Sequence, residues 1–275
     1  MATELMNAED SNIDNNNRKV IGVERPSYLT SYEKEDFGTG EILKVVRPPM
    51  IKIVQTMTGP PVKPPYTDGD IVVLPMLIKI GGGQSEDTQE PIEFTPIFFF
   101  RSWFTWNPLQ MKGQLSPIRE SSFDENGEIA KKAKGKDTRR EACPENNEYK
   151  IVHCEHLNYI TLVDNPDVAE LPMLMSFSRG EYTTGSMYGS LLQVRRAPIY
   201  CCRFQATVKD VVGQLGTWKG FDITNSLNPW VDPAIVERNK ELFETYKKLH
   251  VSRMIEFDLG EEDVAEVETL NSDFS

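Results

Sequence analysis

The segment from residue 94 to residue 106, FTPIFFFRSWFTW, constrains the fold more than any other part of the chain. It holds five Phe and two Trp in thirteen positions, whereas only 9% of the 275 residues are aromatic. Aromatic side chains favour strands, where they pack across a pleated surface. Because successive side chains of a strand point to opposite faces, the segment predicts one long strand with two different faces.

The two faces differ in chemistry. The even-numbered face is almost entirely aromatic and consists of Phe94, Phe98, Phe100, Phe104 and Trp106. The odd-numbered face mixes rings with a cation and small groups, namely Thr95, Ile97, Phe99, Arg101, Trp103 and Thr105. The even face suits a core. The odd face suits a groove for single-stranded nucleic acid, where bases stack on aromatic rings and Arg or Lys contacts phosphates.

Two later strands repeat the pairing of an aromatic residue with a nearby cation. IYCCRF contains Tyr200 and Arg203, and GTWKG contains Trp218 and Lys219. Each of these rings is equally compatible with an ordinary core position. Three strands with the same combination nevertheless predict a shared DNA-binding groove formed by Phe99, Arg101, Trp103, Tyr200, Arg203, Trp218 and Lys219.

The rest of the pattern is that of a small barrel. The other predicted strands lie at 71–80, 149–163, 171–178, 197–210 and 216–223. A helix is predicted at 183–196, and another at 232–249 begins with Asp232 as N-cap and Pro233 in the first turn. This order favours a mainly β fold: an OB-fold-like five-stranded barrel with long insertions, one helix between strands 3 and 4, and a C-terminal helix.

The chain is expected to form one domain between two polar ends. Residues 1–18 are rich in Asn and Asp and are expected to be disordered. Residues 19–255 are expected to form the nucleic-acid-binding domain, in which residues 107–148 lose the β pattern and predict a mobile basic insertion. The cations of this insertion that we expect to contact DNA phosphates are Lys131, Lys132, Lys134, Arg139 and Arg140.

Most of the net charge of -12 lies at the C-terminal end. Residues 256–275 hold eight acidic residues and no basic one, which leaves 34 acidic and 30 basic residues, a net charge of -4, in the first 255. We expect a disordered acidic tail that competes with DNA for the groove and recruits partners; a merely solubilising tail is the alternative. The tail residues expected to bind partners are Glu261, Glu262, Asp263, Asp273 and Phe274.

The sequence offers little for catalysis. It contains no GxxxxGK[ST], HExxH or GxSxG motif and only three His residues. We therefore expect no enzyme and no cofactor. A zinc site is a weaker hypothesis: Cys143, His153, Cys154 and His156 are ligand types, but they lack a CxxC-like pair, and neighbouring strand residues point to opposite faces. A half-buried strand with ordinary polar contacts is the alternative.

The Cys content and the hydropathy of the chain indicate where in the cell the protein is expected. Four Cys, two of them adjacent, do not form a disulfide framework and indicate a reducing cytoplasm. The chain has no run of about 18 apolar residues, and its first residues do not resemble a secretory signal. We expect neither a membrane partner nor secretion.

The succession PMLMSFS, helix, APIYCCRFQATV and GTWKGFDI, preceded by FTPIFFFRSWFTW, resembles phage-encoded single-stranded DNA-binding proteins of the podovirus type. The likeness extends over residues 70–225 and the acidic tail. It implies an OB-fold that coats single-stranded DNA during replication and recombination in the host-cell cytoplasm. It also implies an acidic, Phe-containing C-terminus that contacts a polymerase, helicase or primase. A homodimer is compatible with this interpretation.

The chain departs from that pattern in two places. Some similar phage proteins carry a four-cysteine cluster in the insertion, whereas only Cys143 and Cys154 remain here. The tail also ends in Ser275 rather than Phe. Two other functions stay open: a viral assembly protein that uses the aromatic strand as an oligomer interface, and a nuclease, which would need Mg²⁺-binding carboxylates in the body of the chain.

Overall fold

The computed structural model describes residues 47–55, 66–83, 89–111, 113–168, 170–213 and 216–255. All of them belong to one compact unit of the chain. The predictions for residues 1–18 and for the tail residues Glu261, Glu262, Asp263, Asp273 and Phe274 fall outside the described residues.

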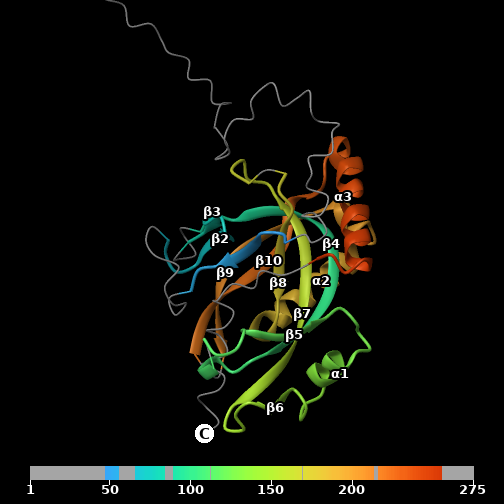
Figure 1. Ribbon diagram of the computed structural model, residues 1–275. Helices are drawn as coiled ribbons and strands as arrows, with labels where there is room; N and C mark the ends of the chain where they lie inside the picture. The colour runs from blue at the N-terminus through green and yellow to red at the C-terminus, as the bar shows by residue number, and fades with distance from the viewer. Residues whose placement is uncertain are drawn as a thin grey trace, which may run out of the picture. The chain divides into compact units, whose positions relative to one another are not determined.

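The described part of the chain is mainly β and contains a single curled sheet of ten strands (Figure 1). The strands are β1 (Met50–Ile53), β2 (Asp70–Leu74), β3 (Ile78–Gly82), β4 (Ile92–Trp106), β5 (Ile118–Ser122), β6 (Arg140–Ala142), β7 (Lys150–Val163), β8 (Met173–Phe177), β9 (Cys202–Gly213) and β10 (Gly216–Trp230). The α-helices are α1 (Glu128–Lys134), α2 (Tyr182–Arg195) and α3 (Pro233–Val251). Short 3-10 turns lie at Leu109–Met111, Arg179–Glu181 and Ile199–Cys201.

The predicted aromatic strand is β4, and it lies inside the sheet. The strand order is β10-β9-β4-β7-β8-β1-β2-β3, with β5 paired to β4 and β6 to β7. The four neighbours β9, β4, β7 and β8 are antiparallel, and β9 returns beside β4 after the β4-β7-β8 meander. This is the order of a Greek key.

A β-bulge divides β4 and corrects the predicted alternation of its faces. Pro96 pairs with Thr161 and Phe98 with Ile160, so Ile97 is an extra residue in the ladder. An extra residue reverses the side-chain alternation beyond it. Phe94 therefore lies on the opposite face from Phe98, although even spacing predicted the same face.

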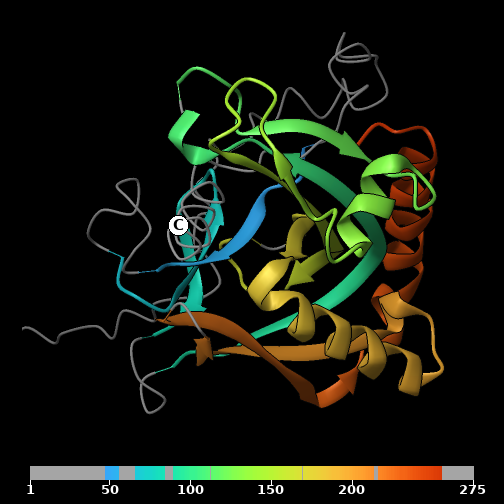
Figure 2. The ribbon, with the colours of Figure 1, turned by 90° about the horizontal axis from the view of Figure 1, so that it is seen from below.

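The two faces of the sheet are covered by different helices. On the inner side of the curl, Tyr188 of α2 packs between Phe94 and Phe204. On the outer side, Phe243 of α3 packs edge-on against Phe98. Figure 2 shows α3 outside β4 and α2 inside the curl. The α3 prediction is confirmed, including its cap: Asp232 Oδ1 accepts a 2.9 Å hydrogen bond from the amide of Ala234.

Two glutamine side chains bridge the seam of the curl, where the segments after β1 and before β4 approach the hairpin of β9 and β10. The Gln55 amide donates to the carbonyl of Lys219 at 2.5 Å and accepts from the amide of Lys219 at 2.8 Å. Gln89 makes the same two contacts with Val208, at 2.5 and 3.1 Å. Each side chain thus substitutes for a neighbouring strand and satisfies backbone groups of β9 or β10.

Two sequence predictions were wrong in detail. The strand predicted at 71–80 is a hairpin of β2 and β3, because the chain turns at residues 75–77 after the cis Leu74-Pro75 bond. The insertion at 107–148 is not a bare loop, since β5, α1 and β6 lie within it and pair with or pack against the sheet. These short elements were not predicted because the sequence of the insertion is polar, and they form only by pairing with or packing on β4 and β7.

Candidate nucleic-acid interface

Beyond its bulge, β4 exposes two side chains on the inner face of the sheet. Phe99 retains 36% of its surface exposed, while one side of its ring lies 4.8 Å, centroid to centroid, from Tyr159. Arg101 follows two residues later on the same face, with 43% of its side chain exposed. Phe99 and Arg101 are thus exposed on one face, as the strand alternation predicted, and the core supports one side of the Phe99 ring.

Two acidic residues contact Arg101, and a tyrosine contacts one of these acids. Arg101 Nη1 lies 3.5 Å from Oε1 of Glu155 and 3.5 Å from Oε1 of Glu125. The hydroxyl of Tyr182, at the start of α2, donates a 3.1 Å hydrogen bond to Oε2 of Glu155. Burial raises the pKa of Tyr182 and Glu155 raises it further, while the positive charges of Arg101 and Arg139 oppose the rise. Tyr182 therefore stays a neutral donor near neutral pH.

Trp103 contradicts the prediction of an open stacking residue. Only 1% of it is exposed, and it packs under Ala130 and Ala133 of α1. Lys134 Nζ lies 5.7 Å from the centroid of the ring. The strand pattern placed Trp103 on the correct face, but α1, which the sequence did not predict, covers it.

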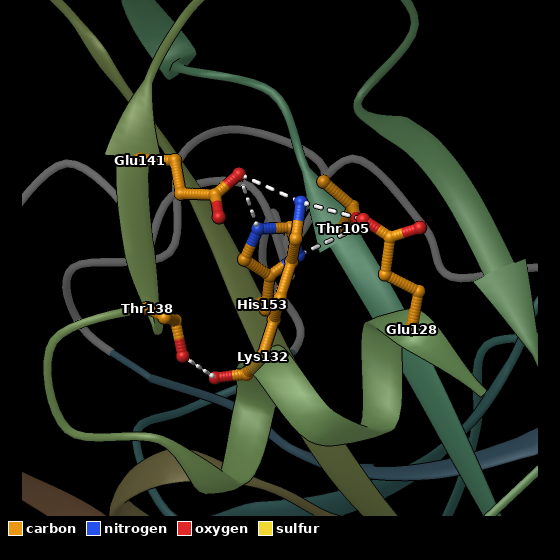
Figure 3. Close-up of polar contacts among 6 residues, drawn as sticks. All are labelled: Thr105, Glu128, Lys132, Thr138, Glu141 and His153. Atoms are coloured by element: carbon orange, nitrogen blue, oxygen red, sulfur yellow. Dashed lines mark hydrogen bonds and ion pairs between the residues drawn. The ribbon is translucent and has the colours of Figure 1, made fainter. Parts of the chain in front are cut away.

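Helix α1 is fastened to the sheet by polar contacts (Figure 3). Lys132 Nζ lies 2.9 Å from Glu141 of β6 and 3.3 Å from Glu128 of its own helix. The hydrogen bond with Glu141 raises the pKa of Lys132 and lowers that of Glu141, so both stay charged. After the helix, Arg139 Nε donates to the carbonyl of Ala133 at 3.2 Å.

A buried histidine continues this network below α1. His153 Nδ1 lies 2.9 Å from Thr105 Oγ1, and Nε2 lies 3.5 Å from Glu141 (Figure 3). Burial lowers the pKa of His153, and the attraction of Glu141 only partly offsets this. Although hydroxyl, imidazole and carboxylate lie in series, Thr105 and His153 are buried. The series therefore ties β4, β7 and β6 together and offers no nucleophile to a substrate.

The predicted basic residues are divided by this arrangement. Lys132 is engaged in ion pairs, whereas Lys131, Lys134 and Arg139 are exposed and Arg140 is half-buried. Lys134 is linked to Arg101 through Glu125, whose Oε1 lies 3.6 Å from Lys134 Nζ. We call Phe99, Arg101, Lys134, Arg139 and Tyr182 the Arg101 face.

The Tyr200 and Arg203 pair does not join the Arg101 face as predicted. Tyr200 packs 5.5 Å from Phe243 under α3, on the outer side of the sheet. Arg203 lies 2.6 Å from both Glu93 and Asp164. The predicted shared groove is therefore wrong for this pair, because the 3-10 turn at Ile199–Cys201 directs Tyr200 outward and two carboxylates neutralise Arg203.

The Trp218 and Lys219 pair is half-buried. A Cβ placed on Gly180 would come within 2.7 Å of the indole of Trp218, so the ring lies directly on this glycine. Lys219 forms a 2.9 Å ion pair with Asp210 and retains only 14% exposure. Both residues therefore make contacts within the fold: Trp218 packs on Gly180, and Lys219 pairs with Asp210 of β9.

The four zinc candidates do not meet. Cys143 Sγ donates to Glu145, whereas Cys154 Sγ accepts a 3.2 Å hydrogen bond from Arg179 Nε. His153 contacts Thr105 on the inner side, and His156 Nδ1 lies 3.1 Å from Ser176 Oγ. The described residues contain no group of three or more His, Cys, Asp or Glu placed to hold a metal ion.

We compared the chain with protein-family models, curated proteins and solved structures and found no match. Within the described ranges, none of the helices has the length and apolar character needed to cross a membrane.

Three residues of the site were not found from the sequence. Glu155 lies on the predicted strand 149–163, whereas Tyr182 directly precedes the predicted helix 183–196. The alternation of β7 places Glu155 opposite Trp103, so correct strand pairing would have identified it. Glu125 lies in the turn between β5 and α1 and carries no sequence signal. All three are chemically ordinary residues that matter only through their position beside Arg101.

Proposed function

We propose that this chain is a non-enzymatic protein that binds single-stranded DNA without sequence preference through the Arg101 face. The observation that carries the proposal is the exposed ring of Phe99, held against Tyr159, beside the exposed guanidinium of Arg101. A fixed ring stacks on any base, with a contribution of about 1–3 kcal/mol, and a neighbouring cation contacts the phosphate. Neither contact reads the sequence of the strand.

The fold supports the proposal. We infer an OB-type barrel built from β4, β7, β8, β9 and β10, with α2 between the third and the fourth of these strands. Their Greek-key order fits this class, which binds oligonucleotides on one face of the barrel. Strands β1, β2 and β3 extend the sheet beyond β8 and are additions to that barrel.

The cations around the strand support the same function. Lys134 and Arg139 extend positive charge from Arg101 along the α1 side of the face. We propose that the acidic segment 256–275 competes with DNA for these cations and, when displaced, contacts replication enzymes. On the resemblance of the sequence, we propose that this activity serves phage DNA replication and recombination in the host-cell cytoplasm.

The aromatic strand is a poor oligomer interface. Of its seven aromatic rings only Phe99 is exposed, because the others are buried in the two cores or beneath α1. An assembly protein that uses this strand as its contact surface would need those rings at the surface. DNA binding accounts for Phe99 and Arg101 together.

The direct test is the affinity for labelled oligo-dT, measured by fluorescence anisotropy at two salt concentrations. We expect Phe99→Ala and Arg101→Gln each to weaken binding about fivefold or more. Leu227→Ala, an exposed apolar residue of β10, and Arg238→Gln, an exposed ion-paired Arg of α3, are the matched controls. Affinity should fall with salt as counterion release requires. Binding that is absent, or equally affected by the controls, would refute the proposal.

A further inference from the structure

A single carboxylate oxygen lies between two exposed cations of the Arg101 face. Glu125 Oε1 lies 3.5 Å from Arg101 Nη1 and 3.6 Å from Lys134 Nζ. The cations come from β4 and α1, elements that the packing of Trp103 under α1 holds together. The ring of Trp103 also lies under Lys134 Nζ, at 5.7 Å. Arg101 and Lys134 therefore share one carboxylate oxygen, which offsets the repulsion between their like charges.

The two acids that contact Arg101 are not equivalent. Glu155 is only 13% exposed, lies within strand β7 and accepts the hydrogen bond from Tyr182. Glu125 is 58% exposed and lies in a turn. Both acids lie 3.5 Å from Arg101 Nη1, which is longer than the 2.7–2.9 Å of strong charge-assisted hydrogen bonds, so they differ in burial and in the Tyr182 contact rather than in distance. Glu155 thus positions Arg101, whereas Glu125 is held loosely enough to be replaced.

We propose that Arg101 and Lys134 form a phosphate subsite that Glu125 occupies in the free protein. This inference rests on the proposed function and specifies where the backbone of the strand binds. A phosphate oxygen carries the same charge as the Glu125 carboxylate, and Arg can bind two phosphate oxygens at once. On binding, the phosphate replaces Glu125 while Glu155 keeps Arg101 in place beside Phe99, whose ring takes the base.

The test removes the charge of Glu125 and compares the ligand affinity of this variant with that of a variant in which another exposed Glu is changed in the same way. Glu125→Gln is measured against Glu244→Gln, whose carboxylate is similarly exposed on α3 and lies 3.9 Å from Lys247. The full chain is titrated with inorganic pyrophosphate by calorimetry and with labelled oligo-dT by anisotropy. We expect Glu125→Gln to bind both ligands about threefold more tightly than Glu244→Gln, the scale of one exposed ion pair. In the Arg101→Gln background this gain should disappear.

The two ligands separate the failure of this inference from the failure of the proposed function. Equal pyrophosphate affinity in the two Gln variants, or a gain that persists without Arg101, would overturn the subsite whatever oligo-dT does. A gain for pyrophosphate with no binding of oligo-dT by any variant would support the subsite and refute DNA binding. Circular dichroism melting curves confirm that each variant is folded, and Glu125→Ala provides a second variant with the same expected gain.

Discussion

The Tyr182 hydroxyl donates a 3.1 Å hydrogen bond to the Glu155 carboxylate and so joins the start of α2 to the middle of β7. The other oxygen of this carboxylate faces Arg101. Without the hydroxyl, Glu155 loses the donor that orients it, and Arg101 gains rotamer freedom that binding must remove. We expect Tyr182→Phe to weaken oligo-dT binding about two- to fivefold. Tyr149→Phe, which removes a hydroxyl from the residue just before β7, should leave the affinity unchanged.

The burial of Trp103 predicts a stability effect. Trp103→Ala opens a cavity under α1 and should lower the free energy of unfolding by about 3–5 kcal/mol, measured by denaturant titration. Trp230→Ala is the control, because 47% of Trp230 is exposed. Iodide quenching provides a second measurement: the accessible fraction of tryptophan fluorescence should rise in Trp103→Ala and fall in Trp230→Ala. The reverse changes would place Trp103 at the surface.

The seam contacts of Gln55 predict a second loss of stability. Gln55→Ala leaves both the amide and the carbonyl of Lys219 without their side-chain partner. We expect a loss of about 1–3 kcal/mol in the free energy of unfolding. Gln193→Ala, on the exposed side of α2, is the control. Hydrogen exchange at the Lys219 amide should accelerate only in Gln55→Ala; unchanged protection there would contradict the bracing role.

Two histidines, one buried and one half-buried, predict the response of stability to mild acid. Burial lowers the pKa of His153 and of His250, so the unfolded chain binds protons more readily than the folded one. Stability should therefore be fully present above the ordinary histidine pKa of about 6.5 and should fall as pH drops below it. In the double variant His153→Gln, His250→Gln, the slope of unfolding free energy between pH 7 and 5.5 should be reduced. An unchanged slope would exclude both residues as its source.

The charge of the C-terminal segment predicts an autoinhibitory effect. A chain that ends at Phe257 lacks seven of the eight acidic residues at 256–275. It should bind oligo-dT more tightly than the full chain at low salt, and the difference should shrink as salt screens the competing carboxylates. A full-length chain with those seven residues changed to Asn or Gln should behave like the truncated one. If truncation leaves affinity unchanged or lowers it, the competition is disproved.

The long elements of the fold follow from local sequence rules. The aromatic run 94–106 lies within β4, and Asp232 with Pro233 begins α3 as expected. These predictions succeed because strand alternation and helix capping depend on neighbours a few residues apart. The same rules gave Phe99 and Arg101 their common face.

Tertiary structure decided which side chains stay accessible. The bulge at Ile97 moved Phe94 to the other core, and a seven-residue helix hidden in a polar insertion covered Trp103. Carboxylates distant in sequence neutralised Arg203 and occupied the space beside Arg101. Burial and ion pairing depend on the residues that strand pairing brings together from far along the chain. The sequence alone therefore determined the strand that carries the candidate interface, whereas the fold reduced its exposed residues to Phe99 and Arg101.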